Sequence, residues 1–247
     1  MKNIVRKIFK KFGYEIVAQH LINKMVNTSD RGLLGLDFYY LLPDYVDASK
    51  FQCCFDIGAN LGQTTDKFIK YFPSAKIYSY EPVAETYQLI HKKFSALSHV
   101  NIAKKALSDF EDASFEICLH ESDQQNSLLN TNGQGPREKV SVTTLDEECK
   151  KLGISHIDFL KIDTEGCELQ VINGAKRMIS EGRIDFIYAE IGFQPEDREH
   201  TFFLNLSSTL YSKGYRLLGL FENIHNGNPL QFHYANALFM LKRNITS

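Results

Sequence analysis

The chain lacks any hydrophobic run of about 18 residues that could cross a membrane, and it lacks a signal peptide with an apolar core and a small-residue cleavage site. It also lacks a Cys-x-x-Cys pair, and its 5 cysteines are odd in number. Three of them fall in expected strands. These absences predict buried free thiols in a reducing, cytoplasmic compartment rather than a disulfide framework or a zinc ribbon.

A strong charge of either sign is missing as well. The formal net charge is -2, and the body of the chain has no basic stripe with interleaved aromatic residues. Long-range attraction to nucleic acid is therefore not expected, and we predict no nucleic-acid partner. With 247 residues, of which 43% are hydrophobic, the chain can bury the core of one α/β domain. No feature of the sequence indicates an oligomeric state.

Charge is uneven only at the N-terminus, where five lysine and arginine residues precede the first acid, Glu15. Apolar residues recur on one helical face between Ile4 and Phe12, which predicts a basic amphipathic helix over residues 1–13. Such a helix could contact an anionic membrane surface peripherally, or pack on its own domain or another chain. We therefore expect residues 1–49 to be this helix and a lead-in, and residues 50–247 to be the main domain.

The stretch from Phe55 to Gly62 predicts a buried strand, a tight glycine turn and the start of a helix. Asp56, Gly58, Asn60 and Gly62 give the spacing Asp-x-Gly-x-x-x-Gly, in which Asn60 replaces the second glycine of a dinucleotide motif. An acid before the loop disfavours a pyrophosphate and suits the amino group of an amino-acid-like ligand. The simpler interpretation is an ordinary turn in which Asp56 accepts hydrogen bonds from nearby amides.

Glu81 follows a second expected strand, residues 76–80. An acid at the end of that strand can accept hydrogen bonds from both hydroxyls of a ribose. We expect Pro82 to start the next helix, so Glu81 could also simply stabilise the helix N-terminus. The two roles are compatible.

Strands and helices alternate along the chain, which predicts a parallel sheet with helices on both faces. Four acids, Asp56, Glu81, Asp163 and Glu190, lie at the carboxyl ends of expected strands. Ligands bind such sheets at that edge. The four acids therefore predict a binding site there.

The chain resembles the FkbM family of S-adenosylmethionine-dependent methyltransferases. The resemblance depends on FDIGANLG at 55–62, YSYEP at 78–82, KKALSD at 104–109, TLDE at 144–147, FLKIDTEGCELQVINGA at 159–175 and NALF at 236–239. It implies a Rossmann-like class I methyltransferase fold, with a seven-stranded, mostly parallel sheet whose last strand is antiparallel. It also implies S-adenosylmethionine as cofactor, bound without a metal. By this resemblance, the methionine part contacts Asp56, Gly58, Asn60 and Gly62. The ribose contacts Glu81, and the adenine edge contacts Ala106, Leu107, Ser108 and Asp109.

The same resemblance suggests O-methylation of a small-molecule or glycan acceptor, such as a sugar. A general base would assist that reaction, and Asp163 is our first choice, with Glu190 second. Both acids could instead bind a divalent cation such as magnesium, or Asp163 could cap the following helix. His225 or His233 could also serve as base or sugar-binding donor.

Two other functions stay open from the sequence. A nicotinamide-dependent oxidoreductase would share the sheet and Glu81, but Asn60 interrupts its glycine motif. A non-catalytic module that binds the cofactor or a partner protein would need neither Asp163 nor Glu190 for its function.

Overall fold

The computed structural model describes residues 38–41, 46–119, 128, 135–225 and 231–244. The amphipathic helix predicted for residues 1–13 lies outside them. Among the helices in the described ranges, none has the length and apolar character needed to traverse a bilayer.

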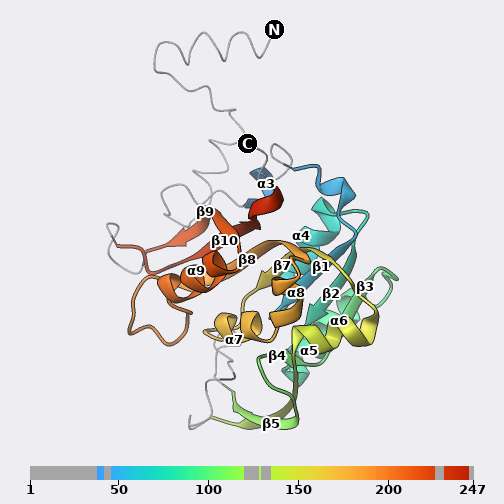
Figure 1. The fold of residues 1–247 in the computed structure, drawn as a ribbon. Helices are drawn as coiled ribbons and strands as arrows, with labels where there is room; N and C mark the ends of the chain where they lie inside the picture. Colours follow the sequence, from blue (N-terminus) through green and yellow to red (C-terminus); the bar gives the residue numbers. More distant parts are fainter. Residues whose placement is uncertain (1–37, 42–45, 120–127, 129–134, 226–230, 245–247) are drawn as a thin grey trace, which may run out of the picture.

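The main sheet contains seven strands in the order β3-β2-β1-β7-β8-β10-β9 (Figure 1). Strand β10 runs antiparallel to the other six strands, which are parallel to one another, and this confirms the predicted fold. Strands β1, β2 and β3 follow one another from the centre of the sheet toward one edge. The strands from β7 onward extend from the centre toward the other edge, so the strand order reverses between β1 and β7. The strands are β1 (Cys53–Ile57), β2 (Lys76–Tyr80), β3 (Val100–Ala103), β7 (Ile157–Ile162), β8 (Ile184–Gly192), β9 (Tyr215–Ile224) and β10 (Tyr234–Leu241).

Side chains that alternate along the central strands divide the core into two layers. In β7, Phe159 packs on one face of the sheet and Leu160 on the other. The face with Phe159 is rich in aromatic residues and is covered by α3 (Phe38–Leu41) and α4 (Gln63–Tyr71). Helices α6 (Leu145–Leu152), α7 (Glu168–Asn173), α8 (Lys176–Ser180) and α9 (Phe203–Ser212) contribute to the other face.

The stretch expected to be a lead-in contributes to this core. Phe38 and Tyr39 of α3 are buried, and the ring of Phe38 stacks on that of Phe159 with centroids 5.7 Å apart. Because α3 lies before residue 50, packing of the main domain begins N-terminal to the expected boundary.

Helix α5 (Ala84–Phe94) begins two residues later than predicted. Pro82 does not occupy the first helical position, because Val83 is the extended N-cap residue and donates its amide to the Glu81 carboxylate at 2.9 Å. The turn between β2 and α5 is therefore organised around Glu81.

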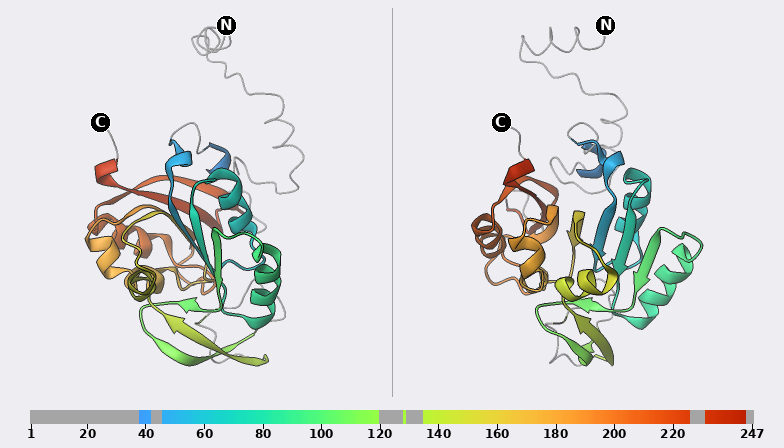
Figure 2. Two further views of the ribbon diagram at one scale, coloured as in Figure 1. Left: turned by 90° about the vertical axis from the view of Figure 1, so that its right-hand side faces the viewer. Right: turned by 45° about the vertical axis from the view of Figure 1, so that its right-hand side comes forward.

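A second, three-stranded sheet has the order β4-β6-β5. It lies apart from the main sheet, near the carboxyl ends of the strands of the main sheet (Figures 1 and 2). Its strands are β4 (Ala106–Leu107), β5 (Asp112–Cys118) and β6 (Arg137–Thr143). The sequence did not predict a second sheet separate from the main one. All five cysteines are free thiols, as expected.

Candidate functional site

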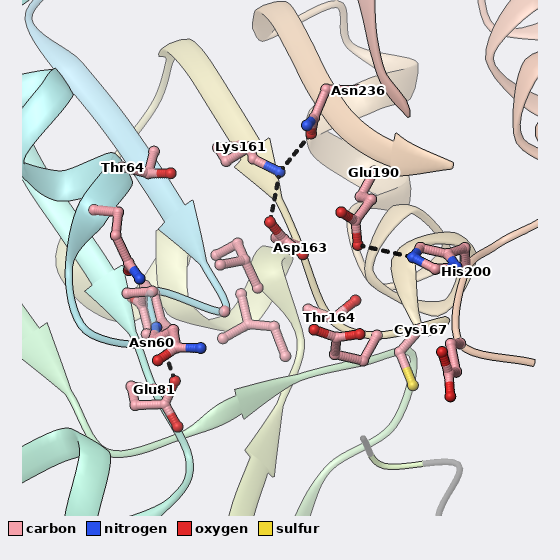
Figure 3. Close-up of a pocket in the computed structure, with 18 of the residues that line it drawn as sticks. Asn60, Thr64, Glu81, Lys161, Asp163, Thr164, Cys167, Glu190, His200 and Asn236 are labelled. Carbon is pink, nitrogen blue, oxygen red and sulfur yellow. Dashed lines mark hydrogen bonds and ion pairs between the residues drawn. The ribbon is translucent and has the colours of Figure 1, made fainter. Parts of the chain in front are cut away.

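A cavity of about 650 Å³ lies at the carboxyl ends of the central strands, where the strand order reverses. Open parallel sheets bind ligands at such a reversal because the loops on its two sides diverge. In Figure 3, Asn60 and Glu81 lie on one side of Asp163, whereas Glu190 and His200 lie on the other. We call these parts the Glu81 half, with Asn60 and Glu81, and the His200 half, with Glu190 and His200.

The glycine loop after β1 forms one wall of the Glu81 half. Gly58 has φ 80°, and a Cβ at this position would lie 1.7 Å from the carbonyl oxygen of Asp163. Only glycine therefore allows the loops after β1 and β7 to approach each other here. Asn60 also has a positive φ, 46°, and its side-chain oxygen is buried without a hydrogen-bond partner among the described residues. Both residues line the cavity.

Asp56 and Gly62 lie behind this wall and do not line the cavity. The Asp56 carboxylate is buried and accepts a hydrogen bond from the Thr65 hydroxyl at 2.7 Å, and burial raises its pKa to about 6. A Cβ on Gly62 would lie 2.5 Å from the ring of Phe94, so this glycine permits α4 and α5 to pack. Of the four loop residues, Gly58 and Asn60 are the ones placed to contact a ligand.

Glu81 is buried at the floor of its half, where its two oxygens accept amide hydrogen bonds from Val83 at 2.9 Å and Asn60 at 3.0 Å. Burial raises the pKa of Glu81 to about 7, although the two amide donors oppose this effect. A carboxylate has about four acceptor sites, so each oxygen can accept one more hydrogen bond. Glu81 is therefore fixed in place and still able to bind a pair of hydroxyls.

The segment from Ala106 to Asp109 is divided by the fold. Ala106 and Leu107 form β4 and line the cavity, which places apolar side chains near Glu81. Ser108 is buried away from the cavity and donates its amide to the carbonyl of Thr143 at 2.9 Å, whereas Asp109 is exposed. Ala106 and Leu107 are thus the two positioned to contact a flat ligand such as adenine.

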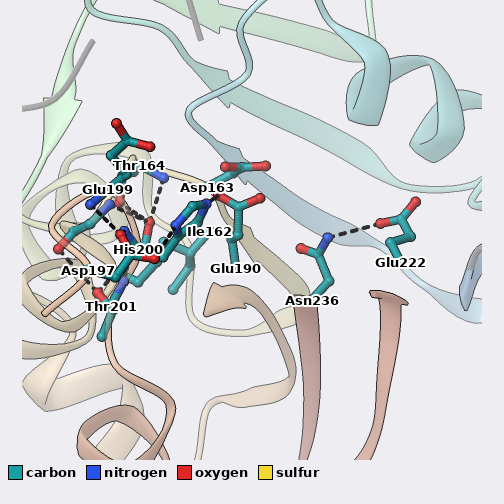
Figure 4. A network of polar contacts seen from close by, with 12 residues as sticks. Ile162, Asp163, Thr164, Glu190, Asp197, Glu199, His200, Thr201, Glu222 and Asn236 are labelled. Carbon is teal, nitrogen blue, oxygen red and sulfur yellow. Dashed lines mark hydrogen bonds and ion pairs between the residues drawn. The ribbon is translucent and has the colours of Figure 1, made fainter. Parts of the chain in front are cut away.

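An ion pair between the buried Lys161 and the half-buried Asp163 stands between the two halves. Lys161 of β7 donates to the Asp163 carboxylate at 3.0 Å and to the side-chain oxygen of Asn236 at 2.8 Å, and Asn236 in turn donates to Glu222 at 3.0 Å (Figures 3 and 4). Burial disfavours both charges, yet Lys161 holds the pKa of Asp163 below its ordinary value. A carboxylate whose pKa is lowered is a weaker proton acceptor, which disfavours the role of general base that was expected for Asp163.

Glu190 differs from Asp163 in its protonation. Burial, followed by the nearby charge of Asp163, raises the pKa of Glu190 well above its ordinary value. A hydrogen bond from Glu190 is also among the causes that lower the pKa of Asp163. The two shifts have opposite directions, so a proton shared by these carboxyls is held more tightly by Glu190 than by Asp163.

Glu165 completes a group of three carboxyls with Asp163 and Glu190, whose nearest oxygens all lie within 4.8 Å of one another. Burial and the charge of Asp163 raise the pKa of Glu165 to about 8. Oxygen ligands of this kind suit magnesium. A divalent cation here would displace the protons on Glu165 and Glu190 and share Asp163 with Lys161.

Glu168 ties the loop after β7 to the loop after β8, a role that the sequence did not indicate. One of its oxygens accepts from the Thr164 amide at 2.8 Å and hydroxyl at 3.0 Å, and the other from the Thr201 amide at 3.2 Å and hydroxyl at 2.6 Å. Figure 4 shows how close Thr164 and Thr201 lie to His200. The fully buried Glu168 carboxylate thus positions both loops that form the His200 half.

His200, also missed from the sequence, lies on the loop after β8 and lines the cavity. Its Nδ1 is 2.8 Å from an oxygen of Asp197 and its Nε2 is 3.7 Å from an oxygen of Glu190. The ring stacks on Tyr234 with centroids 4.3 Å apart. The polar run around His200 has no periodic pattern, so only the fold reveals its position. Lys161, by contrast, could have been noticed as a charge inside a buried strand.

The two histidines considered from the sequence, His225 and His233, also line the cavity. Nδ1 of His225 is 3.1 Å from the carbonyl oxygen of Gln231, and the ring of His233 lies 5.7 Å from that of His200. Both border the His200 half. Among the described residues, neither has a carboxylate as close to a ring nitrogen as Asp197 is to His200.

Comparison with known proteins identifies the family. The sequence matches the model described as the Methyltransferase FkbM domain over residues 56–217. The chain therefore belongs to the FkbM family of methyltransferases, as its motifs predicted. It is similar to the 2-O-methyltransferase NoeI of Sinorhizobium fredii, with 27% identity over 157 residues that cover 56% of this chain and 63% of NoeI. The match thus spans less than two thirds of that relative.

Solved structures of other methyltransferases are more distant. Fibrillarin of Aeropyrum pernix, in complex with S-adenosylmethionine, has 12% identity and a TM-score of 0.45, and the match covers 77% of this chain and 66% of that one. TrmK of M. capricolum, in complex with S-adenosylhomocysteine, has 12% identity and a TM-score of 0.48, with 84% and 69% covered. Both TM-scores are below 0.5, so the family assignment depends on the sequence match.

Proposed function

We propose that this FkbM-family protein transfers a methyl group from S-adenosylmethionine to a hydroxyl oxygen of a sugar or glycan. The single observation that supports this most is the cavity with two halves at the strand reversal. One half offers a fixed carboxylate beside two apolar residues, whereas the other offers donors and acceptors for hydroxyl groups. Asp163 lies between the two.

The residues of the Glu81 half fit the cofactor. The unused acceptor sites of Glu81 suit the two ribose hydroxyls, and Ala106 and Leu107 offer an apolar surface to the adenine. The unpartnered side-chain oxygen of Asn60 can accept from the cationic amino group of the methionine part. Gly58 lets the backbone approach the ligand without a Cβ. When bound there, S-adenosylmethionine supplies an activated methyl group on its sulfonium.

The His200 half fits an acceptor rich in hydroxyls. Asp163, whose pKa is lowered, accepts hydrogen bonds when ionised, whereas Glu190, whose pKa is raised, can donate one when protonated, and the side chain of Asn236 can donate as well. We propose that Asp163 and Glu190 contact the acceptor and align its hydroxyl with the methyl group, since alignment in a dry site supplies much of the acceleration in such displacements. The name of NoeI, a 2-O-methyltransferase, supports oxygen as the atom that is methylated.

Calorimetric titration with S-adenosylmethionine and S-adenosylhomocysteine tests the cofactor. Glu81→Gln removes the charge that would accept from the ribose, so we expect at least about tenfold weaker binding. The matched control is Glu85→Gln, an exposed acid in the first turn of α5. Absence of binding to the wild-type protein, or equal binding by both variants, would reject the proposed site.

Transfer of a tritiated methyl group from S-adenosylmethionine to a panel of methyl hexosides and short oligosaccharides tests the acceptor. We expect Asp163→Ala and Glu190→Ala to lose transfer while they still bind S-adenosylhomocysteine. A non-catalytic module would bind the cofactor product and show no transfer to any acceptor. A nicotinamide oxidoreductase, which family membership disfavours, would be protected from melting by nicotinamide cofactors instead.

We also propose that residues 1–13 bring the enzyme to an anionic membrane surface and that it has no nucleic-acid partner. The proposal depends on the basic amphipathic pattern of that segment, with Lys2, Arg6, Lys7, Lys10 and Lys11 opposite its apolar face. Sedimentation with anionic vesicles should be strong for the full chain and weak for a chain that lacks residues 1–13. Equal sedimentation of the two would remove the proposal.

A further inference from the structure

His200, which lines the cavity, and its partner Asp197, which does not, have the geometry of a base and the group that orients it. An ionised carboxylate can only accept hydrogen bonds, so the contact of 2.8 Å between Asp197 and Nδ1 of His200 places the imidazole proton on Nδ1. In the neutral ring the free electron pair is then on Nε2. Nε2 is the nitrogen that faces Glu190 in the His200 half.

Asp197 is itself held rigidly. Its other oxygen accepts the amides of Glu199 at 2.8 Å and His200 at 3.3 Å, and only 6% of its side chain is exposed. At Gly192, the last residue of β8, a Cβ would lie 2.9 Å from an Asp197 oxygen and 3.0 Å from the Cβ of His200. The loop can therefore pack on the end of β8 because residue 192 has no side chain. Both oxygens of Asp197 are thus used to fix the loop and the ring.

The other ionisable groups around His200 are less suited to accept a proton. Asp163 accepts from Lys161 at 3.0 Å, which lowers its pKa, and Glu190 lies beside Asp163, whose charge together with burial raises the pKa of Glu190 well above its ordinary value. Imidazole, in contrast, is the side chain that most readily exchanges a proton near neutral pH. The remaining neighbours are Tyr234 at the start of β10 and His233 just before β10, whose rings pack against that of His200, and Glu199 on the same loop as His200.

We propose that His200 is the general base of methyl transfer and that Asp197 is the residue that positions it. This inference depends on the proposed function. As the acceptor oxygen forms its bond to the methyl carbon, the bond from that carbon to sulfur breaks and its electron pair stays on sulfur. The hydroxyl proton passes to Nε2 of His200, and the resulting imidazolium is stabilised by Asp197 until the proton leaves to solvent. Asp163 and Glu190 then hold the acceptor.

The first test needs no acceptor. Nitrogen-15 NMR of histidine-labelled protein reports the tautomer of each ring. We expect neutral His200 to carry its proton on Nδ1, and we expect Asp197→Ala to lose this preference. A neutral ring with the proton on Nε2, or a ring that stays protonated from pH 6 to 9, would overturn the proposal whatever the acceptor is.

The second test is kinetic and uses the tritium-transfer assay with the methyl hexoside and oligosaccharide panel. His200→Gln should lower kcat by roughly 10²- to 10⁴-fold and lose the pH-dependent limb of the profile, since a positioned base contributes that much. Binding of S-adenosylhomocysteine should change by less than about twofold. Added imidazole should restore part of the activity of His200→Ala. Asp197→Asn should show a smaller loss in kcat.

The matched control is His156→Gln. His156 also pairs with an aspartate, with its Nε2 2.9 Å from an oxygen of Asp185, but it lies outside the cavity, just before β7. If His200→Gln transfers methyl groups as fast as His156→Gln, His200 is not the base. Activity lost on chelation and restored by a divalent ion would indicate a metal at Asp163, Glu165 and Glu190 or at Asp197, His200 and His233. Only an ion that also shifts the ring nitrogen signals of His200 would assign the second group and overturn the proposal. Failure of the proposed function is distinct, because wild-type protein would then bind no S-adenosylhomocysteine.

Discussion

Glu168 is the residue whose removal should most clearly separate stability from chemistry. Glu168→Ala deletes the carboxylate that accepts from the amides and hydroxyls of Thr164 and Thr201 and, at 3.3 Å, from the amide of Gly166. The hydroxyls can turn to other partners and the bond from Gly166 is long, but the amides of Thr164 and Thr201 are left without an acceptor. An unsatisfied buried donor costs about 1–3 kcal/mol, so two amides cost about 2–6 kcal/mol. We take about 3 kcal/mol as the lower part of that range.

For a chain of this length, a loss of 1 kcal/mol lowers Tm by about 2–4 °C, so Glu168→Ala should melt about 6–12 °C below the wild type. Glu168→Gln keeps one acceptor oxygen but turns an NH₂ group toward one set of donors, and about half of the loss is expected. Both variants should also loosen the loop that carries His200, because Thr201 follows it directly.

Scanning calorimetry checks this prediction, with Glu196→Ala as the control. Glu196 is an exposed acid on the same loop as His200. A Glu168→Ala protein that melts within about 2 °C of the control would refute the reasoning, because it would show that the buried amides find other acceptors without cost.

Two further predictions concern the Glu81 half. Gly58→Ala and Gly153→Ala both place a side chain at positive φ. The new Cβ would collide with the Asp163 carbonyl at residue 58, whereas at residue 153 it has no atom within 4 Å. Chemical denaturation should show a loss of about 1–2 kcal/mol for Gly153→Ala and at least about 3 kcal/mol for Gly58→Ala, and similar losses would contradict this account. Burial raises the pKa of Glu81 to about 7, so its carboxyl is mostly protonated at pH 6 and mostly ionised at pH 8. Only the ionised carboxylate can accept hydrogen bonds from both ribose hydroxyls. S-adenosylhomocysteine should therefore bind up to about tenfold more tightly at pH 8 than at pH 6. Calorimetry that shows no such change in the wild type, or the same change in Glu81→Gln, would refute this assignment.

Much of the fold follows from short-range patterns that the sequence displays. Apolar runs and the glycine stretch located β1, the turn and α4, and alternation of strands with helices predicted the parallel sheet. Glu81 could be assigned because its place at the end of a strand is a property of sequence order. The exact start of α5 could not, since the Glu81 carboxylate itself organises the turn before the helix.

What the sequence alone determined, then, is the family, the sheet and the acids at its carboxyl edge, because each depends on residues close together in the chain. The tertiary structure decided which of those acids face the cavity and which proton each one holds. Asp56 lies behind the loop, and Lys161 is the main cause that lowers the pKa of Asp163 against the effect of burial. It also brought Asp197 and His200 to the cavity. Burial and charge pairing between distant segments determine protonation, and neither can be read from spacing along the chain.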